Sequence, residues 1–63
     1  MTPDELKRIR KRLRLTQAEL AKELGVTRVS VARWEVGIYA VPEMAARLLE
    51  HLVRERRGPT QKS

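Results

Sequence analysis

The sequence predicts an all-α fold, a compact bundle of four or five short helices. Three observations favour it: threonine capping signals recur along the chain, apolar residues follow each signal at a spacing of three and four, and glycines stand where the middle helices should stop. The 63 residues suffice for only one domain. We expect that domain over residues 1–57 and a disordered polar tail over 58–63, which Gly58 and Pro59 interrupt.

The first helix is predicted from the capping box Thr-Pro-Asp-Glu near the start of the chain. The Thr2 hydroxyl can cap a backbone N–H while Glu5 reaches back, and Pro3 occupies the first helical position, where its missing N–H costs nothing. Apolar residues follow at helical spacing and should form the buried stripe: Leu6, Ile9 and Leu13.

The next two helices are predicted to meet at a glycine turn. Thr16 opens a second capping box, and its helix should cover residues 17–24 and stop at Gly25, which readily adopts a left-handed backbone. Thr27 caps the following helix, expected over residues 28–35. Because a connection of about three residues does not suit antiparallel neighbours, the two helices should cross at about 90–120°, as a helix-turn-helix.

The helix at 28–35 has two different sides. Its core side is predicted to carry Val31 and Trp34, with Trp34 assigned to the core rather than to base stacking. The opposite side carries no acid, and its residues are Arg28, Val29, Ala32 and Arg33. With a net charge of +6 for the whole chain, this outward side is predicted to contact nucleic acid.

A fourth helix should begin at Pro42. Its apolar residues span about 180° of the helical wheel, wider than one small core requires: Met44, Ala45, Leu48, Leu49, Leu52 and Val53. We place Leu49 and Val53 at the far edge from Met44 and Leu48, and expect them in a dimer interface.

Enzyme and membrane functions are not favoured. His51 is the only histidine and Asp4 the only aspartate, and no cysteine, paired carboxylates or glycine-rich phosphate loop is present, so we expect no metal, cofactor or small-molecule ligand. No apolar run approaches the ~20 residues that span a membrane, and no signal peptide is evident. We expect a cytoplasmic protein.

Over residues 3–56 the sequence resembles the lambda-repressor-like DNA-binding domains of the Cro and XRE type. The residues that carry the resemblance are Leu15-Thr16-Gln17-Ala18-Glu19-Leu20-Ala21, Leu24-Gly25-Val26-Thr27, Val31, Trp34-Glu35 and Gly37. The resemblance implies a compact all-α domain whose third helix enters the DNA major groove, usually as a dimer on an operator. The fourth helix also resembles that of small phage and mobile-element regulators.

Residue roles follow from this resemblance. Base contacts are implied for Arg28, Val29 and Arg33, where arginine can bond guanine and valine can touch a thymine methyl. Contacts to the DNA backbone are implied for Gln17, Thr27, Ser30 and Tyr39. Val29 departs from the family, in which a polar residue is frequent at this position. Tyr39 could equally cap the edge of the core. In relatives, an arginine at the position of Arg10 often pairs with the glutamate matching Glu35, which makes Arg10 structural.

The favoured hypothesis is therefore a sequence-specific regulator of transcription that binds double-stranded DNA. It would act as a homodimer on a palindromic operator and repress its own operon. The alternative is an antitoxin-like protein-interaction module with secondary DNA binding, which is disfavoured because only a short tail follows the fourth helix. A basic surface for membranes or RNA is also disfavoured, because the apolar side of the first helix is needed in the core.

Overall fold

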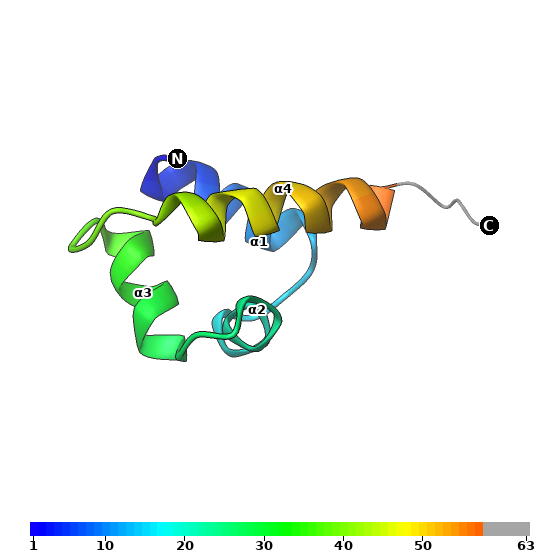
Figure 1. Ribbon diagram of the computed structural model, residues 1–63. Helices are drawn as coiled ribbons and strands as arrows, with labels where there is room; N and C mark the ends of the chain where they lie inside the picture. The colour runs from blue at the N-terminus through cyan, green and yellow to red at the C-terminus, as the bar shows by residue number, and fades with distance from the viewer. Residues whose placement is uncertain (58–63) are drawn as a thin grey trace.

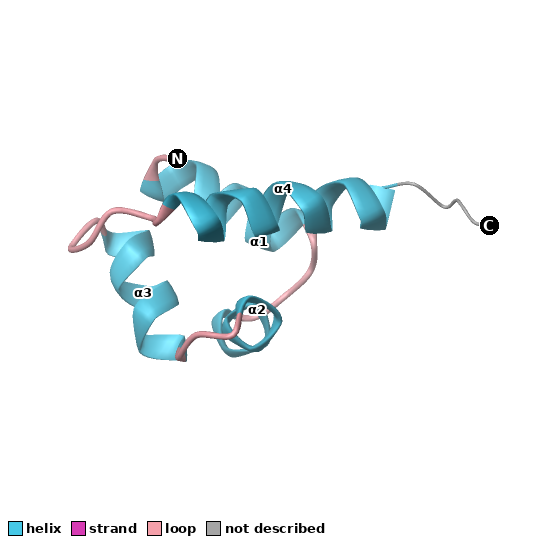
Figure 2. Ribbon diagram, in the orientation of Figure 1, coloured by secondary structure: helices cyan, strands magenta, loops and turns pink. Residues whose placement is uncertain are grey.

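The computed structural model describes residues 1–57 as an all-α domain (Figures 1 and 2). Its helices are α1 (Pro3–Arg12), α2 (Gln17–Leu24), α3 (Arg28–Val36) and α4 (Glu43–Arg57). The predicted fold class is confirmed with four helices rather than five in this part of the chain, and no strand forms there. The predicted tail at 58–63 lies outside the described residues.

The predicted helix starts are present. The backbone N–H of Thr2 donates to Glu5 Oε1 at 2.8 Å and Glu5 N–H donates to Thr2 Oγ1 at 3.1 Å, and the Thr16–Glu19 box has the same two distances. Thr27 caps α3 by accepting from the backbone N–H of Ser30 at 3.2 Å. Local sequence therefore sets where the first three helices begin.

The same three helices end in one type of turn. After α2 and α3 the chain passes through Gly25 and Gly37, whose φ angles of 74° and 86° are left-handed. Paired backbone bonds close each turn, as from Gly37 N–H to Trp34 O at 3.3 Å and Ile38 N–H to Arg33 O at 3.0 Å. At the end of α1 the left-handed residue is Arg14, with φ 60°. The sequence gives no sign of this left-handed arginine, since such positions favour glycine.

The core lies where α2 and α3 cross and where α1 and α4 cover them. Four side chains are wholly buried, one from each helix: Leu6, Leu20, Val31 and Leu49. Trp34 is also buried, as predicted, and α3 packs against both α1 and α2. The helices α2 and α3 thus rest on a single hydrophobic core to which every helix contributes.

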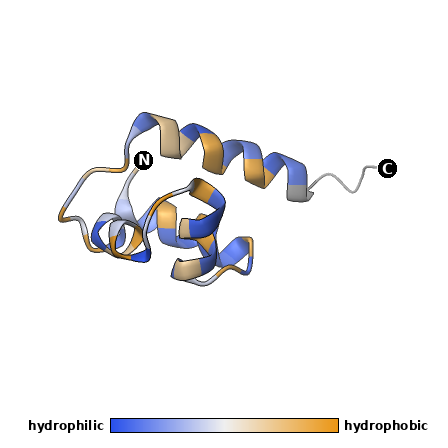
Figure 3. Ribbon diagram, turned by 60° about the horizontal axis from the view of Figure 1, so that its bottom comes forward, coloured by the Kyte–Doolittle hydropathy of each residue, from blue (hydrophilic) through white to orange (hydrophobic). Residues whose placement is uncertain are grey.

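The predicted orientation of α4 is wrong. Leu49 was expected in a dimer interface but is completely buried in the chain's own core, together with Ala45. Conversely, Met44 is 77% exposed and Leu48 is 42% exposed. Figure 3 shows hydrophobic positions recurring along the whole of α4, so their spacing alone did not decide which side of the helix faces the core. The small side chain of Ala45 lets this side of the helix approach the core, and Leu49 follows one turn later on the same side.

Two smaller details of α4 also differ from or refine the prediction. The helix begins at Glu43, one residue later than expected. Pro42 precedes it, and its carbonyl accepts the first hydrogen bond of the helix, from the N–H of Ala46 at 3.0 Å. Val53, the other predicted interface residue, is partly buried and lines a shallow hollow between α1 and α4. It therefore keeps some surface that a second chain can contact.

Candidate nucleic-acid interface

The outward side of α3 is accessible on the surface of the helix-turn-helix. Arg28 and Arg33 are exposed, and Val29 between them is 46% exposed. Ser30 and Ala32 are half-buried, and the only acid of the helix, Glu35, points inward and is buried. The outward side of α3 therefore offers two cationic groups and an apolar contact with no carboxylate of its own to oppose them.

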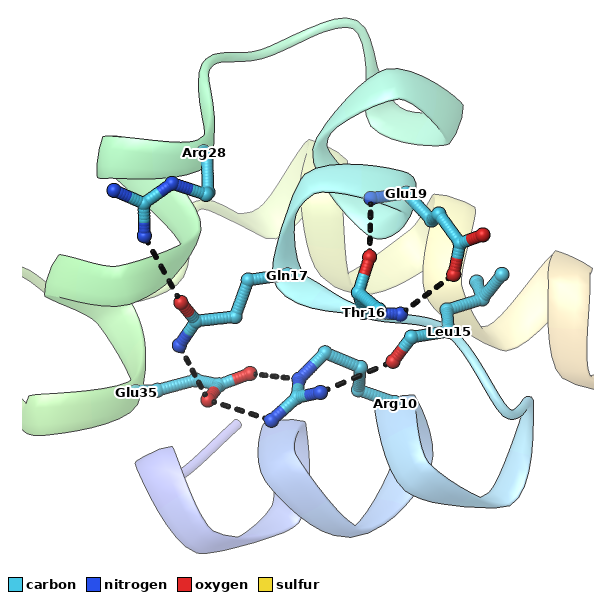
Figure 4. A network of polar contacts seen from close by, with 7 residues as sticks. All are labelled: Arg10, Leu15, Thr16, Gln17, Glu19, Arg28 and Glu35. Carbon is cyan, nitrogen blue, oxygen red and sulfur yellow. Dashed lines mark hydrogen bonds and ion pairs between the residues drawn. The ribbon is translucent and has the colours of Figure 1, made fainter.

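Glu35 is held by an ion pair beneath this side. Arg10 Nε donates to Glu35 Oε2 at 2.5 Å, Arg10 Nη2 donates to Oε1 at 3.2 Å, and Arg10 Nη1 donates to the carbonyl of Leu15 at 3.0 Å (Figure 4). The side chains of Glu35 and Arg10 are only 3% and 15% exposed. This is the pair that the family resemblance implied, and it joins α1 to α3.

The ion pair also determines the charge state of Glu35. Burial raises the pKa of this carboxyl group, but hydrogen bonds from Arg10 and Gln17, with the positive charges of Arg10 and Lys7, lower it further than burial raises it. The net effect is a pKa below the ordinary value of a glutamate. Glu35 is thus an anion at neutral pH, as its partners require.

Gln17 connects this pair to the exposed side of α3. Its Nε2 donates to Glu35 Oε1 at 3.1 Å, and its Oε1 accepts from Arg28 Nη1 at 3.4 Å (Figure 4). The side-chain amide that was expected to hold a DNA phosphate is therefore engaged within the protein. Contact of Gln17 with the DNA backbone remains a prediction, and its link to Arg28 was not foreseen because it depends on how α2 and α3 cross.

The remaining predicted backbone contacts lie at the two ends of α3. At its start, the hydroxyls of Thr27 and Ser30 are 3.2 Å apart, and Thr27 is also the cap. Beyond its end, Tyr39 is 57% exposed, so it does not cap the core. The guanidinium carbon of Arg33 lies 5.8 Å from the centre of the Tyr39 ring, a contact that sequence reasoning missed. DNA contact by these three residues remains a prediction.

Charge is distributed unequally over the rest of the domain. Outside the core, α1 and the turn after it are basic: α1 carries half-buried Lys7 and exposed Arg8, Lys11 and Arg12, and Arg14 follows in the turn. On α4, by contrast, basic and acidic side chains contact each other one turn apart: Arg47 Nη2 lies 3.0 Å from Glu43 Oε2, and the imidazole Nε2 of His51 lies 3.2 Å from Glu55 Oε2. The excess of basic over acidic residues is therefore largest on α1, where it can attract a polyanion over a distance.

Two features are absent from residues 1–57. No group of three or more acidic, histidine or cysteine side chains comes together there as a metal site would require. None of the four helices is long and apolar enough to cross a membrane.

Comparison with known proteins agrees with this geometry. A family described as helix-turn-helix matches residues 6–53, which is more than half of the chain and covers all of α2 and α3. No curated protein and no solved structure shows significant similarity to this chain. The chain belongs to the helix-turn-helix family of the lambda Cro and XRE type, whose members are DNA-binding regulators of transcription.

Proposed function

We propose that this chain is a sequence-specific repressor that binds a palindromic operator in double-stranded DNA, with α3 in the major groove. It would act in the cytoplasm and regulate its own operon. The observation that carries the proposal is the outward side of α3, where exposed Arg28 and Arg33 flank Val29 without an opposing acid. Short capped helices on a common core present these side chains on a rigid support.

Each residue has a distinct proposed role. Arg28 and Arg33 would bond the O6 and N7 atoms of guanine, and Val29 would contact a thymine methyl group. Backbone contacts would fix the register of the helix in the groove without reading sequence. These contacts are assigned to Gln17, Thr27, Ser30 and Tyr39.

We further propose that the repressor is a two-fold dimer, although not through Leu49. Exposed apolar residues continue from the end of α3 along the loop and the first turns of α4: Val36, Ile38, Met44 and Leu48. Val53 can extend such an interface because it is only partly buried. One recognition helix reads few base pairs, so pairing two would supply the affinity that a single domain of this size lacks.

Selection from a random duplex library tests the sequence preference. The expected result is an enriched palindrome with half-sites centred about 34 Å apart, roughly one helical turn. Recovery of unrelated duplexes in proportion to their input would contradict sequence-specific binding. A reporter placed behind the enriched site should lose expression when the chain is present; increased expression would instead indicate an activator.

Sedimentation with and without the selected duplex tests the dimer. Two chains per duplex are expected, and Met44→Lys with Leu48→Lys should lower that number or weaken binding, since charge would enter the apolar surface. Inserting five base pairs between the half-sites should abolish tight binding because it turns them to opposite faces of the DNA. One chain per duplex, with no effect of the insertion, would contradict the dimer.

A second candidate function is an antitoxin-like module in which DNA binding is secondary. The exposed apolar residues Met44 and Leu48 favour it, because such residues on a small monomer often mark a protein interface. The two candidates differ in the effect of Met44→Lys. A repressor dimer should lose operator affinity in this variant, whereas a module with a different partner should keep it.

A further inference from the structure

We infer that Tyr39 is a positioning residue for Arg33, and that the contact between them sets the base preference at one position of the DNA site. The inference rests on the proposed function and deepens it. It assigns the aromatic ring of Tyr39, rather than its hydroxyl group, the main contribution to binding. The carrying observation is the guanidinium of Arg33 over the Tyr39 ring, at 5.8 Å from the ring centre.

The end of α3 brings these two residues together. Arg33 lies in the last turn of the helix, and Tyr39 follows the left-handed Gly37 by two residues. The carbonyl of Arg33 itself accepts the N–H of Ile38 at 3.0 Å, which closes the turn and folds the chain back toward Arg33. The local backbone therefore places the ring beside the arginine without any contribution from DNA.

The geometry suits a cation over an aromatic face. The distance falls within the ~6 Å at which the ring quadrupole attracts a guanidinium. Arg33 has no carboxylate partner among the described residues, whereas Arg10 and Arg47 each have one. The ring is thus the one group in this part of the chain seen to orient the Arg33 charge.

The contact with the ring leaves Arg33 free to read a base. The ring attracts the positive charge of the guanidinium as a whole, and the five N–H donors lie in the plane of that group and point outward from its edge. The donors that would bond O6 and N7 of guanine are therefore not consumed by the ring. An arginine side chain that the ring already restricts loses less conformational entropy when it binds DNA. This smaller loss strengthens binding only to duplexes in which Arg33 bonds a base.

The test is a double-mutant cycle that separates ring from hydroxyl. Tyr39→Phe keeps the ring, and Tyr39→Leu removes it while retaining an apolar side chain. The binding affinity of each variant, alone and combined with Arg33→Ala, is measured on three duplexes: the selected duplex, one changed at the base that Arg33 reads, and a random duplex.

Tyr39→Phe should bind the selected duplex with an affinity within about 2-fold of that of the unmodified chain. Tyr39→Leu should bind it about 3- to 5-fold more weakly, and the affinities of both variants for the changed and random duplexes should differ little from those of the unmodified chain. In the Arg33→Ala background, Tyr39→Leu should have no further effect.

A second measurement needs no DNA. In the free protein, the NMR signals of the Arg33 side chain should show a ring-current shift that persists in Tyr39→Phe and disappears in Tyr39→Leu. Melting temperatures should be the same in all three proteins, because Tyr39 is largely exposed.

Several outcomes would overturn the inference. If Tyr39→Phe is as weak as Tyr39→Leu on every duplex, the hydroxyl contacts phosphate and the ring does not position Arg33. If Tyr39→Leu has the same effect with and without Arg33, the two residues act independently. These failures leave a base preference that depends on Arg33, so the proposed function survives them. A library selection without any enriched duplex would overturn the proposed function and this inference together.

Discussion

The two sides of α3 show how one nine-residue helix can serve both folding and the proposed recognition of DNA. The inner side buries Val31, Trp34 and Glu35, while the outer side exposes Arg28 and Arg33. Inner residues are constrained by shape, since a changed volume leaves a cavity or a clash. Outer residues are constrained only by what they can contact. Substitutions on the two sides should therefore separate loss of stability from loss of binding.

Glu35 is the exception that links the two sides. It is the polar member of the inner side, and through Gln17 it is connected to Arg28 on the outer side. A change at Glu35 should therefore affect stability first and the orientation of Arg28 second. The separation is sharpest between Trp34 and Arg33, which have no such shared partner.

The largest effect is expected from the inner side. Trp34→Ala should reduce the free energy of unfolding by about 3–5 kcal/mol, because it removes the largest buried side chain of the helix. That is enough to unfold much of so small a domain. Circular dichroism during thermal unfolding measures it, and Val29→Ala on the outer side is the matched control, expected to leave the transition unchanged. A cooperatively folded Trp34→Ala protein that has lost only DNA affinity would place Trp34 on the binding surface.

The next effect concerns the buried ion pair. Glu35→Gln keeps the shape of the side chain but leaves Arg10 without its counter-charge, and should cost about 1.5–3 kcal/mol of stability. This is less than the ~3–5 kcal/mol for a wholly buried pair, because Arg10 still reaches water. Urea unfolding measures the change.

The matched control is Glu43→Gln, which breaks the exposed pair with Arg47 on α4. It should cost less than about 1 kcal/mol, since water screens this pair. Equal losses at Glu35 and Glu43 would mean that burial adds nothing to the pair of Glu35.

On the outer side, Arg33→Ala should weaken binding to the selected duplex by about 1–3 kcal/mol and relax the preference at one base position. Affinity for random duplexes should fall much less, and the melting temperature should stay the same because Arg33 is exposed. Fluorescence anisotropy at fixed salt measures both affinities. Equal weakening on selected and random duplexes would show that Arg33 holds phosphate only.

The smallest effect is a loss of stability in acid. Because the pKa of Glu35 is lowered in the folded chain, its contribution is fully present above the unfolded value of about 4.5. It declines as the pH falls from there through the lower folded pKa, where Glu35 becomes protonated. Unfolding in urea between pH 6 and pH 3 should show this decline, and Glu35→Gln should lack that part of it. An identical pH dependence in the two proteins would contradict the assignment to Glu35.

Local signals explain which parts of the fold were predictable. Thr16, Thr27 and Gly25 act on their own neighbours, so α2 and α3 could be placed to within a residue from the sequence. The Arg10–Glu35 pair was foreseen only through the family resemblance, because no spacing rule joins residues on α1 and α3. The exposed arginines followed from the inner side, once Val31 and Trp34 had been assigned to it.

The predictions that were wrong, and the contacts that were missed, depend on packing between helices. Apolar residues occupy about half of the α4 wheel, so periodicity alone did not decide whether Leu48 or Leu49 faces the core. Contact with the other helices decided it. The links from Gln17 to Arg28 and from Tyr39 to Arg33 likewise exist only after α3 has been packed and its end closed. The sequence shows that these side chains are polar or aromatic, but it does not show which side chain each of them contacts.

The closed turn between α2 and α3 has a consequence for the heat of DNA association. Gly25 is already left-handed and Thr27 already caps α3 in the free chain, so no part of this helix has to form when DNA is bound. Proteins that fold as they bind show a large negative heat-capacity change and an unfavourable entropy of ordering. Here the heat-capacity change should correspond to the contact surface alone, and the entropy lost by the protein should come mainly from a few side chains.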